Sequence, residues 1–195
     1  MKKVAKDRPA IAGQWIQALM YLAAVGLINA AADIIPFMPW EASYYISMGI
    51  RFSVVVCLFQ LASVHRFYRI SSILKLVVFL CSVLTAFMKE AAILTFAAAL
   101  SSMIAVFLEY RAHADLIKEK DAKFARKWMK LFLWGIASGV LLSLGSAVSV
   151  DLLSCFETDA ARITSVIVGI LEIPQFIVQF MYVAYLNKMT GLICE

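Results

Sequence analysis

Long stretches without charge dominate the pattern of hydrophobic and polar positions along this chain. Six stretches carry at most one Asp, Glu, Lys or Arg each, at residues 9–32, 42–64, 76–88, 91–108, 131–150 and 163–187. The single charges among them are Arg51 in the second stretch and Glu172 in the last. A helix of about 20 apolar residues crosses the hydrocarbon core of a bilayer, so this pattern predicts six membrane-spanning helices.

The predicted spans extend these stretches to residues 14–35, 43–64, 70–88, 91–110, 131–151 and 163–186. The third span includes Lys75, whose long apolar stem lets its ammonium group reach the interface. Residues 88–91 must join the third and fourth helices with almost no loop, and otherwise one long bent helix replaces the two. The basic start and the apolar run after it are similar to a signal peptide, but the run is too long for one, so a retained helix is expected.

Composition agrees with this pattern. Of the 195 residues, 63% are hydrophobic and 16% are charged, whereas soluble domains are about half apolar and a quarter charged. Neither the few Gly and Pro residues nor the four scattered cysteines indicate a linker, a disulfide framework or a zinc site. The expected fold class is an all-α integral membrane protein, a six-helix bundle formed by one domain over residues 1–195.

The distribution of Lys and Arg predicts the orientation in the membrane. With a cytoplasmic N-terminus, fifteen of the eighteen basic residues fall on the cytoplasmic side, and only Arg51, Lys89 and Arg162 do not. Both termini are therefore expected in the cytoplasm, at a plasma membrane of prokaryotic type. A net charge of +5 can indicate a nucleic-acid partner, but these charges lie between apolar runs, so the expected partner is the lipid bilayer and no nucleic acid.

Ionisable side chains within predicted spans are candidates for function because each is costly in a bilayer unless it is paired or hydrated. On the last helix, Glu172 shares a polar stripe with Ser165, Gln175, Gln179 and Tyr182, and Pro174 lies inside it. The functional interpretation is a ligand-binding or coupling site in the outer half of the bundle, formed by Asn29, Asp33, Arg51, Glu172, Gln175 and Gln179. The structural interpretation is an Arg51–Glu172 ion pair that only fixes helix packing.

Two further features point to packing and to contacts at the cytoplasmic surface. Gly135 and Gly139 form a GxxxG pattern, which favours close helix packing. Residues 111–130 carry seven basic residues and a spacing of apolar residues in multiples of four, which predicts a helix lying on the inner surface. Membrane anchoring is one interpretation of this basic segment, and docking of a cytoplasmic or membrane protein partner is the other.

Catalysis has little support in the sequence. Glu109 and His113 are four residues apart and could hold a metal with His65 or Asp115, but two ligands do not make a site. The motifs of hydrolases and of nucleotide-binding enzymes are missing. We therefore expect no enzyme activity, no catalytic residue, no metal and no cofactor.

In size and in its six-helix layout with a cytoplasmic N-terminus, the chain resembles the substrate-binding subunits of energy-coupling-factor vitamin transporters. The resemblance is one of architecture, and it implies binding of a small ligand from the outer side. The leading hypothesis is binding or transport of a small molecule or cation. The alternative is a non-catalytic accessory subunit that docks a partner through residues 111–130.

Overall fold

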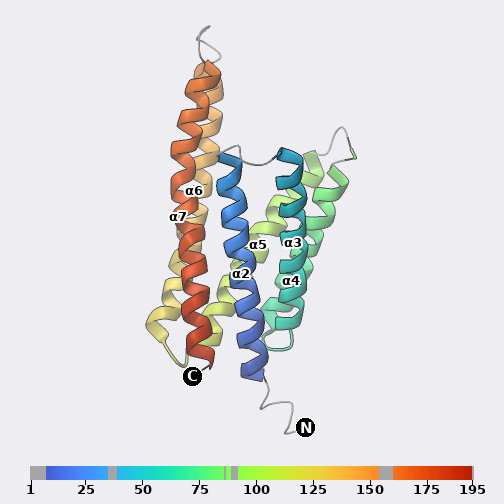
Figure 1. Cartoon of the computed structure of the whole chain (residues 1–195), viewed down its shortest axis with the longest axis vertical. Helices are drawn as coiled ribbons and strands as arrows, with labels where there is room; N and C mark the ends of the chain where they lie inside the picture. Colours follow the sequence, from blue (N-terminus) through green and yellow to red (C-terminus); the bar gives the residue numbers. More distant parts are fainter. Residues whose placement is uncertain (1–7, 35–38, 86, 89–91, 154–159, 195) are drawn as a thin grey trace.

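Six α-helices make up the computed structural model of the chain, which describes residues 8–34, 39–85, 87–88, 92–153 and 160–194 (Figure 1). They are α2 (Arg8–Ile34), α3 (Trp40–Leu61), α4 (Arg66–Thr85), α5 (Ala92–Ile117), α6 (Ala122–Leu153) and α7 (Ala160–Cys194). The described residues contain no strand, and all six helices are long and apolar enough to cross a membrane. The all-helical, six-span prediction is confirmed to that extent.

The helices form a closed ring. Each helix packs against its neighbours in the chain, α7 packs against α2, and α5 also touches α7 across the ring. α2 begins and α7 ends at the same end of the bundle, where α3 is joined to α4 and α5 to α6 (Figure 1). We call this the basal end; that it faces the cytoplasm stays a prediction.

The connection between α5 and α6 differs from the predicted one. α5 continues to Ile117 and α6 begins at Ala122, so only residues 118–121 join them. The predicted surface helix within residues 111–130 is therefore wrong. Phe124 and Trp128 lie one turn apart because that face of α6 packs into the bundle, where both side chains are buried.

The third and fourth predicted helices are separate. α4 ends at Thr85 and α5 begins at Ala92, and the two pack side by side in opposite directions (Figure 1). The Ser71 hydroxyl donates a hydrogen bond of 2.9 Å to the Ala105 carbonyl, so a buried polar contact joins them. Residues 89–91 of the predicted turn lie outside the described residues.

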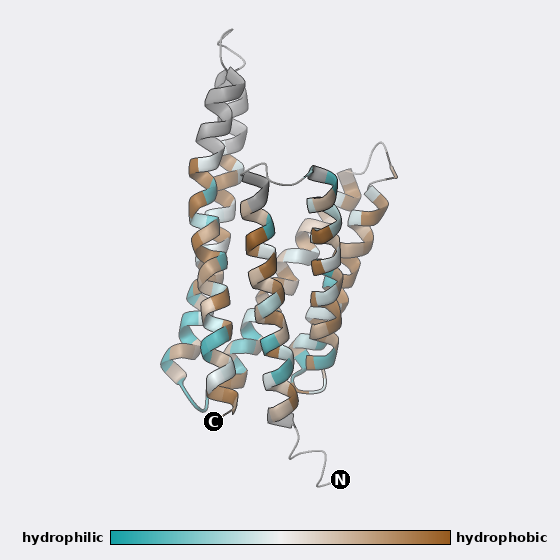
Figure 2. Cartoon of the chain, viewed as in Figure 1, coloured by the Kyte–Doolittle hydropathy of each residue, from teal (hydrophilic) through white to brown (hydrophobic). Residues whose placement is uncertain are grey.

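Large apolar side chains cover the outside of the ring. Ile93, Phe96 and Trp134 are 85%, 72% and 68% exposed. Figure 2 shows hydrophilic residues gathered toward the basal end, with apolar residues above them along the helices. An apolar outer surface on a helical ring suits contact with lipid, where each helix satisfies its own backbone hydrogen bonds.

A glycine allows α6 to approach α7 closely, but this glycine is not part of the GxxxG pattern. A Cβ atom at Gly135 would lie 3.5 Å from Val178 Cγ1, an ordinary contact, and one at Gly139 would meet nothing within 4 Å. A Cβ atom at Gly145 would lie 2.1 Å from Leu171 Cδ1. The closest glycine-dependent approach is therefore at Gly145.

Candidate functional site

A buried carboxylate lies at the centre of the bundle. Glu109 of α5 is 2% exposed, and its Oε2 atom lies 2.5 Å from the Lys75 Nζ atom of α4. The Tyr182 hydroxyl of α7 donates a hydrogen bond to the other oxygen, Oε1. Three helices thus converge on one carboxyl group, and the Lys75 ammonium compensates its charge.

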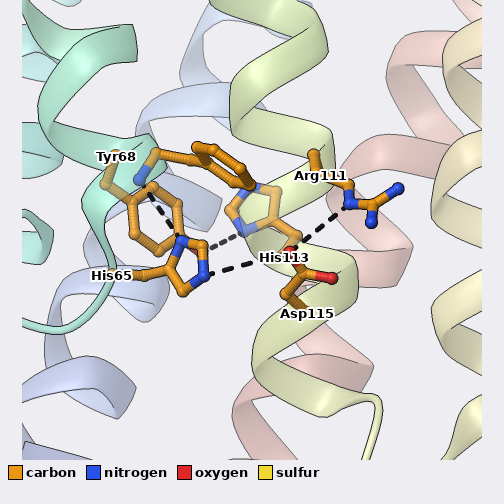
Figure 3. A network of polar contacts seen from close by, with 6 residues as sticks. His65, Tyr68, Arg111, His113 and Asp115 are labelled. Atoms are coloured by element: carbon orange, nitrogen blue, oxygen red, sulfur yellow. Dashed lines mark hydrogen bonds and ion pairs between the residues drawn. The ribbon is translucent and has the colours of Figure 1, made fainter.

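A histidine extends this cluster toward the basal end. His113 lies one turn after Glu109 on α5, and its Nε2 atom is 3.7 Å from Glu109 Oε1. The Tyr68 hydroxyl of α4 lies 2.7 Å from His113 Nδ1, a contact that Figure 3 shows between the two helices. We call these five side chains, Lys75, Glu109, Tyr182, His113 and Tyr68, the polar centre.

Aromatic rings from α5, α6 and α7 pack around the polar centre. The Trp128 ring of α6 lies 4.6 Å from the His113 ring, centroid to centroid, and 5.7 Å from the Tyr182 ring. The Tyr110 and Tyr182 rings are stacked at 5.4 Å. Trp128 and His113 have no exposed surface, so these rings keep water from His113.

A second polar network lies where α3 turns into α4. Asp115 of α5 lies 3.9 Å from His65 and 3.4 Å from Arg111, and Figure 3 shows His65 and Arg111 on either side of it. Partial burial lowers the pKa of His65, and the negative charge of Asp115 opposes this effect. This network ties the α3–α4 turn to α5.

A cavity of about 380 Å³ opens beside the polar centre. All six helices contribute to its lining, and its polar lining residues include Lys75, Glu109, Tyr182, Gln175 and Gln179. The remaining walls are largely apolar, with Leu19 from α2, Val54 from α3 and Phe132 from α6 among them. Cavities of about 300–1,000 Å³ with apolar walls and a few polar groups are typical of small-molecule sites.

A second cavity of about 350 Å³ adjoins the first between α3, α4 and α5. Arg51 lines it, together with Ile50, Val78 and Phe79. The two cavities share Val54, Lys75, Ser102 and Val106 as lining residues. They therefore adjoin each other, and we call them the two lobes of the central cavity; Lys75 lies in the wall of both, and Arg51 is exposed at the second.

The structure brings together only part of the predicted outer site. Gln175 and Gln179 line the first lobe, where Gln175 accepts a hydrogen bond of 2.6 Å from the Ser138 hydroxyl, and Arg51 lines the second lobe. Glu172 lines neither lobe. Among the described residues no ion pair joins Arg51 to Glu172, and their helices, α3 and α7, do not contact each other.

The two candidates on α2 lie elsewhere. Asn29 donates a hydrogen bond of 3.0 Å to the Ser43 hydroxyl, so it joins α2 to α3 instead of lining the cavity. Asp33 belongs to α2, but its side chain is outside the part of the chain that the structure describes. Glu109 and His113 do approach each other, yet the described residues include no group of three His, Cys, Asp or Glu side chains that could hold a metal ion.

The sequence interpretation did not identify Lys75 and Glu109 as the central residues of this site. The sequence predicts that Lys75 reaches the interface, and it presents Glu109 as a possible metal ligand near the end of a span. A signal did exist, because Lys75 and Glu109 lie at matched heights, each about two to two and a half turns from the basal ends of α4 and α5. Opposite charges at one height on adjacent antiparallel helices can form an ion pair.

Chemically, the central cavity offers an ammonium group, a guanidinium group, a compensated carboxylate and two amides within apolar walls. Such a set can hold a polar group by hydrogen bonds while an apolar body contacts the walls. No protein-family model, curated protein or solved structure matches this chain.

Proposed function

We propose that this protein binds a small molecule in the central cavity, within the membrane, as a step in transporting it. The observation that carries the proposal is the cavity of about 380 Å³ lined by all six helices, with the Lys75–Glu109 ion pair in its wall. A bundle that needed only packing would be expected to fill this space with side chains. Charged groups inside a membrane bundle commonly mark a pathway for a substrate or ion.

The proposal places the site at the polar centre instead of the outer half of the bundle. Glu109 and Lys75 neutralise each other, so the wall has little net charge at this point. Gln175 and Gln179 supply amide donors and acceptors, and Tyr182 links α7 to the carboxylate. A ligand that contacts Lys75 or Tyr182 would therefore disturb contacts among α4, α5 and α7, which gives a physical route from binding to helix movement.

A cavity-filling substitution tests this proposal. Val106 lines both lobes of the central cavity, so Val106→Phe should occupy ligand space without removing a polar group. Val140, 51% exposed on α6 and absent from the lining of either lobe, provides the matched control Val140→Phe. The melting temperature (Tm) of each purified protein is measured against a panel of vitamins, amino acids, amines and organic acids.

We expect at least one compound to raise the Tm of the wild type and of Val140→Phe, but not that of Val106→Phe. A ligand at one hundred times its Kd stabilises by about 2.7 kcal/mol, which is enough to shift Tm by several degrees. Uptake of that compound into liposomes containing the protein then tests the transport step. A wild type that no compound stabilises, or equal responses in both variants, would contradict binding in this cavity.

A further inference from the structure

Arg51 is a charged residue near the middle of a candidate span without an acidic partner. It lies between the ends of α3 (Trp40–Leu61), about 15 Å from the basal end at ~1.5 Å per residue. Among the described residues, no carboxylate lies within ion-pair distance of its guanidinium group. It lines the second lobe of the central cavity, between α3, α4 and α5.

The nearby acid cannot compensate Arg51. Glu109 is the one acidic residue that lines the central cavity, and Lys75 and Tyr182 already occupy its two oxygens. Glu172 belongs to α7, which does not contact α3. The charged side chains that line the two lobes, Arg51, Lys75 and Glu109, therefore leave one positive charge uncompensated.

An uncompensated guanidinium group at this depth is costly, and intramembrane charges are usually paired. Because the described protein supplies no partner, an anion entering the cavity would remove this cost. Guanidinium donates two parallel hydrogen bonds to a carboxylate or phosphate, so it recognises such groups in a fixed geometry. Lys75, at the junction of the two lobes, adds a second positive group within the same space.

We propose that the ligand of the central cavity is a small amphiphilic organic acid whose oxyanion binds Arg51. This inference rests on the proposed function and names its ligand class. The apolar part of the acid contacts Val54, Val78 and Val106, and extends toward the first lobe past Lys75. Lobes of about 350 and 380 Å³ accommodate a body of several carbon atoms.

The test compares matched probes that differ in charge. Hexanoate and hexyl phosphate carry an oxyanion on a short apolar chain, and hexanamide carries a neutral group on a similar chain. The Tm and the Kd are measured for the full-length wild type, Arg51→Gln, Arg51→Lys and Arg69→Gln in detergent and in lipid nanodiscs. Arg69→Gln is the control because it removes an exposed positive charge of α4 that lines neither lobe.

Hexanoate or hexyl phosphate should stabilise the wild type and Arg69→Gln, while hexanamide should not. Loss of a charged hydrogen bond should weaken binding to Arg51→Gln by about tenfold to a hundredfold. Arg51→Lys keeps the positive charge without the two-donor geometry, so it should bind the two anionic probes with intermediate affinity. This variant tests the inference even if Arg51→Gln does not fold. The preferred probe, carboxylate or phosphate, identifies the head group.

The outcomes separate this inference from the proposed function. Equal stabilisation by hexanamide and hexanoate, lost in Val106→Phe, would keep the cavity as a binding site but overturn the choice of an anion. Full affinity for hexanoate in Arg51→Gln would overturn the role of Arg51 alone. A wild type that responds to none of the three probes, and to no compound of the wider panel, would overturn both.

Discussion

Glu109 depends on neighbours from two other helices. Lys75 of α4 compensates its charge and the Tyr182 hydroxyl of α7 donates to it, while His113, one turn later on α5, lies on its basal side and packs on Trp128. Burying a carboxylate is unfavourable by itself, and the ion pair offsets that cost only while both partners are present. We therefore expect the contributions of these residues to the stability of the protein to depend strongly on one another.

Removing one member of the ion pair should destabilise the protein more than removing both. Glu109→Gln leaves the Lys75 ammonium without its partner, which should lower the free energy of unfolding by about 3–5 kcal/mol. The double variant Glu109→Gln/Lys75→Met leaves no charge to compensate, so it should recover much of that loss. Unfolding by titration with sodium dodecyl sulfate measures all three variants.

Lys75→Met alone completes this comparison, since it leaves Glu109 with the Tyr182 hydroxyl as its nearest donor. If the effects of the two single substitutions add up to the effect of the double variant within about 0.5 kcal/mol, the two residues are not coupled and the ion pair has no energetic role.

From the sequence, the residues that line the cavity were easier to predict than the contacts they make. Gln175, Gln179 and Arg51 were predicted to line a polar site, and they do line the central cavity. The sequence could not show whether Arg51 pairs with Glu172, because the position of a residue along its helix does not reveal which helices are neighbours. Here α3 contacts α2 and α4, and Arg51 lines the same lobe of the cavity as Lys75.

Individual helices show where the hydrophobic pattern is informative and where it is not. It located all six helices, because each must carry about 20 apolar residues to span a bilayer. The predicted spans end before α5 does and begin after α6 does. Arg111, Lys123 and Lys127 lie on parts of these helices that extend beyond the apolar stretches. Charge marks the limit of an apolar stretch, whereas a helix ends where its backbone hydrogen bonds end.

Gly145 and Gly139 should respond differently to the same substitution. Alanine favours a helix over glycine by about 0.5–1 kcal/mol, and a Cβ atom at Gly139 meets nothing within 4 Å, so Gly139→Ala should raise Tm. At Gly145 the same atom would lie 2.1 Å from Leu171 Cδ1, so Leu171 must move and the gain should be reduced or reversed. Thermal unfolding of both variants measures the difference.

Gly145→Ala/Leu171→Ala tests the cause of that difference, because removing the Leu171 methyl groups removes the collision. Equal Tm values for Gly139→Ala and Gly145→Ala would mean that α6 does not approach α7 closely at Gly145.

The start of α6 depends on Asp121. Its Oδ1 atom accepts a hydrogen bond of 2.8 Å from the Phe124 backbone N–H, which is the contact of an N-cap residue. This hydrogen bond holds the pKa of the Asp121 carboxyl below its ordinary value, and Lys188 acts in the same direction. Because the folded pKa is the lower one, the stabilisation is complete above the unfolded pKa and is lost as the pH falls through the folded pKa.

Asp121→Ala should therefore lower Tm at neutral pH, and the gap between the variant and the wild type should narrow in acid. Asp121→Asn can still accept the hydrogen bond from Phe124, so its Tm should fall less than that of Asp121→Ala. A gap that stays constant from neutral pH to below the folded pKa would show that the ionised carboxylate does not stabilise α6.

The whole molecule combines a ring of six helices with a strongly uneven distribution of charge. The ring closes through α2 and α7, and residues of all six helices line the first lobe of the central cavity. Periodicity predicts which residues share a helix face, but ring closure depends on contacts between residues far apart in the chain. That is why the six helices were predictable while the cavity and the polar centre required the three-dimensional structure.

The uneven distribution of charge predicts the orientation of the molecule in its membrane. The first turn of α6 carries exposed Lys123 close to several other basic residues, whereas the segment between α4 and α5 carries exposed Phe87 at the opposite end of the bundle. Basic residues near the ends of membrane helices are retained in the cytoplasm. In a background without the four native cysteines, Phe87→Cys and Lys123→Cys report the two ends separately.

A membrane-impermeant maleimide should label Phe87→Cys in intact cells and Lys123→Cys only after the cells are opened. Labelling in the reverse order would invert the orientation, and labelling of both sites in intact cells would be inconsistent with a helix crossing the membrane between them. The expected order would place Arg51 about midway through the bilayer, at ~1.5 Å per residue from the cytoplasmic end of α3. At that depth a guanidinium group without a counter-ion is unfavourable, which is the physical reason for expecting an anion beside it.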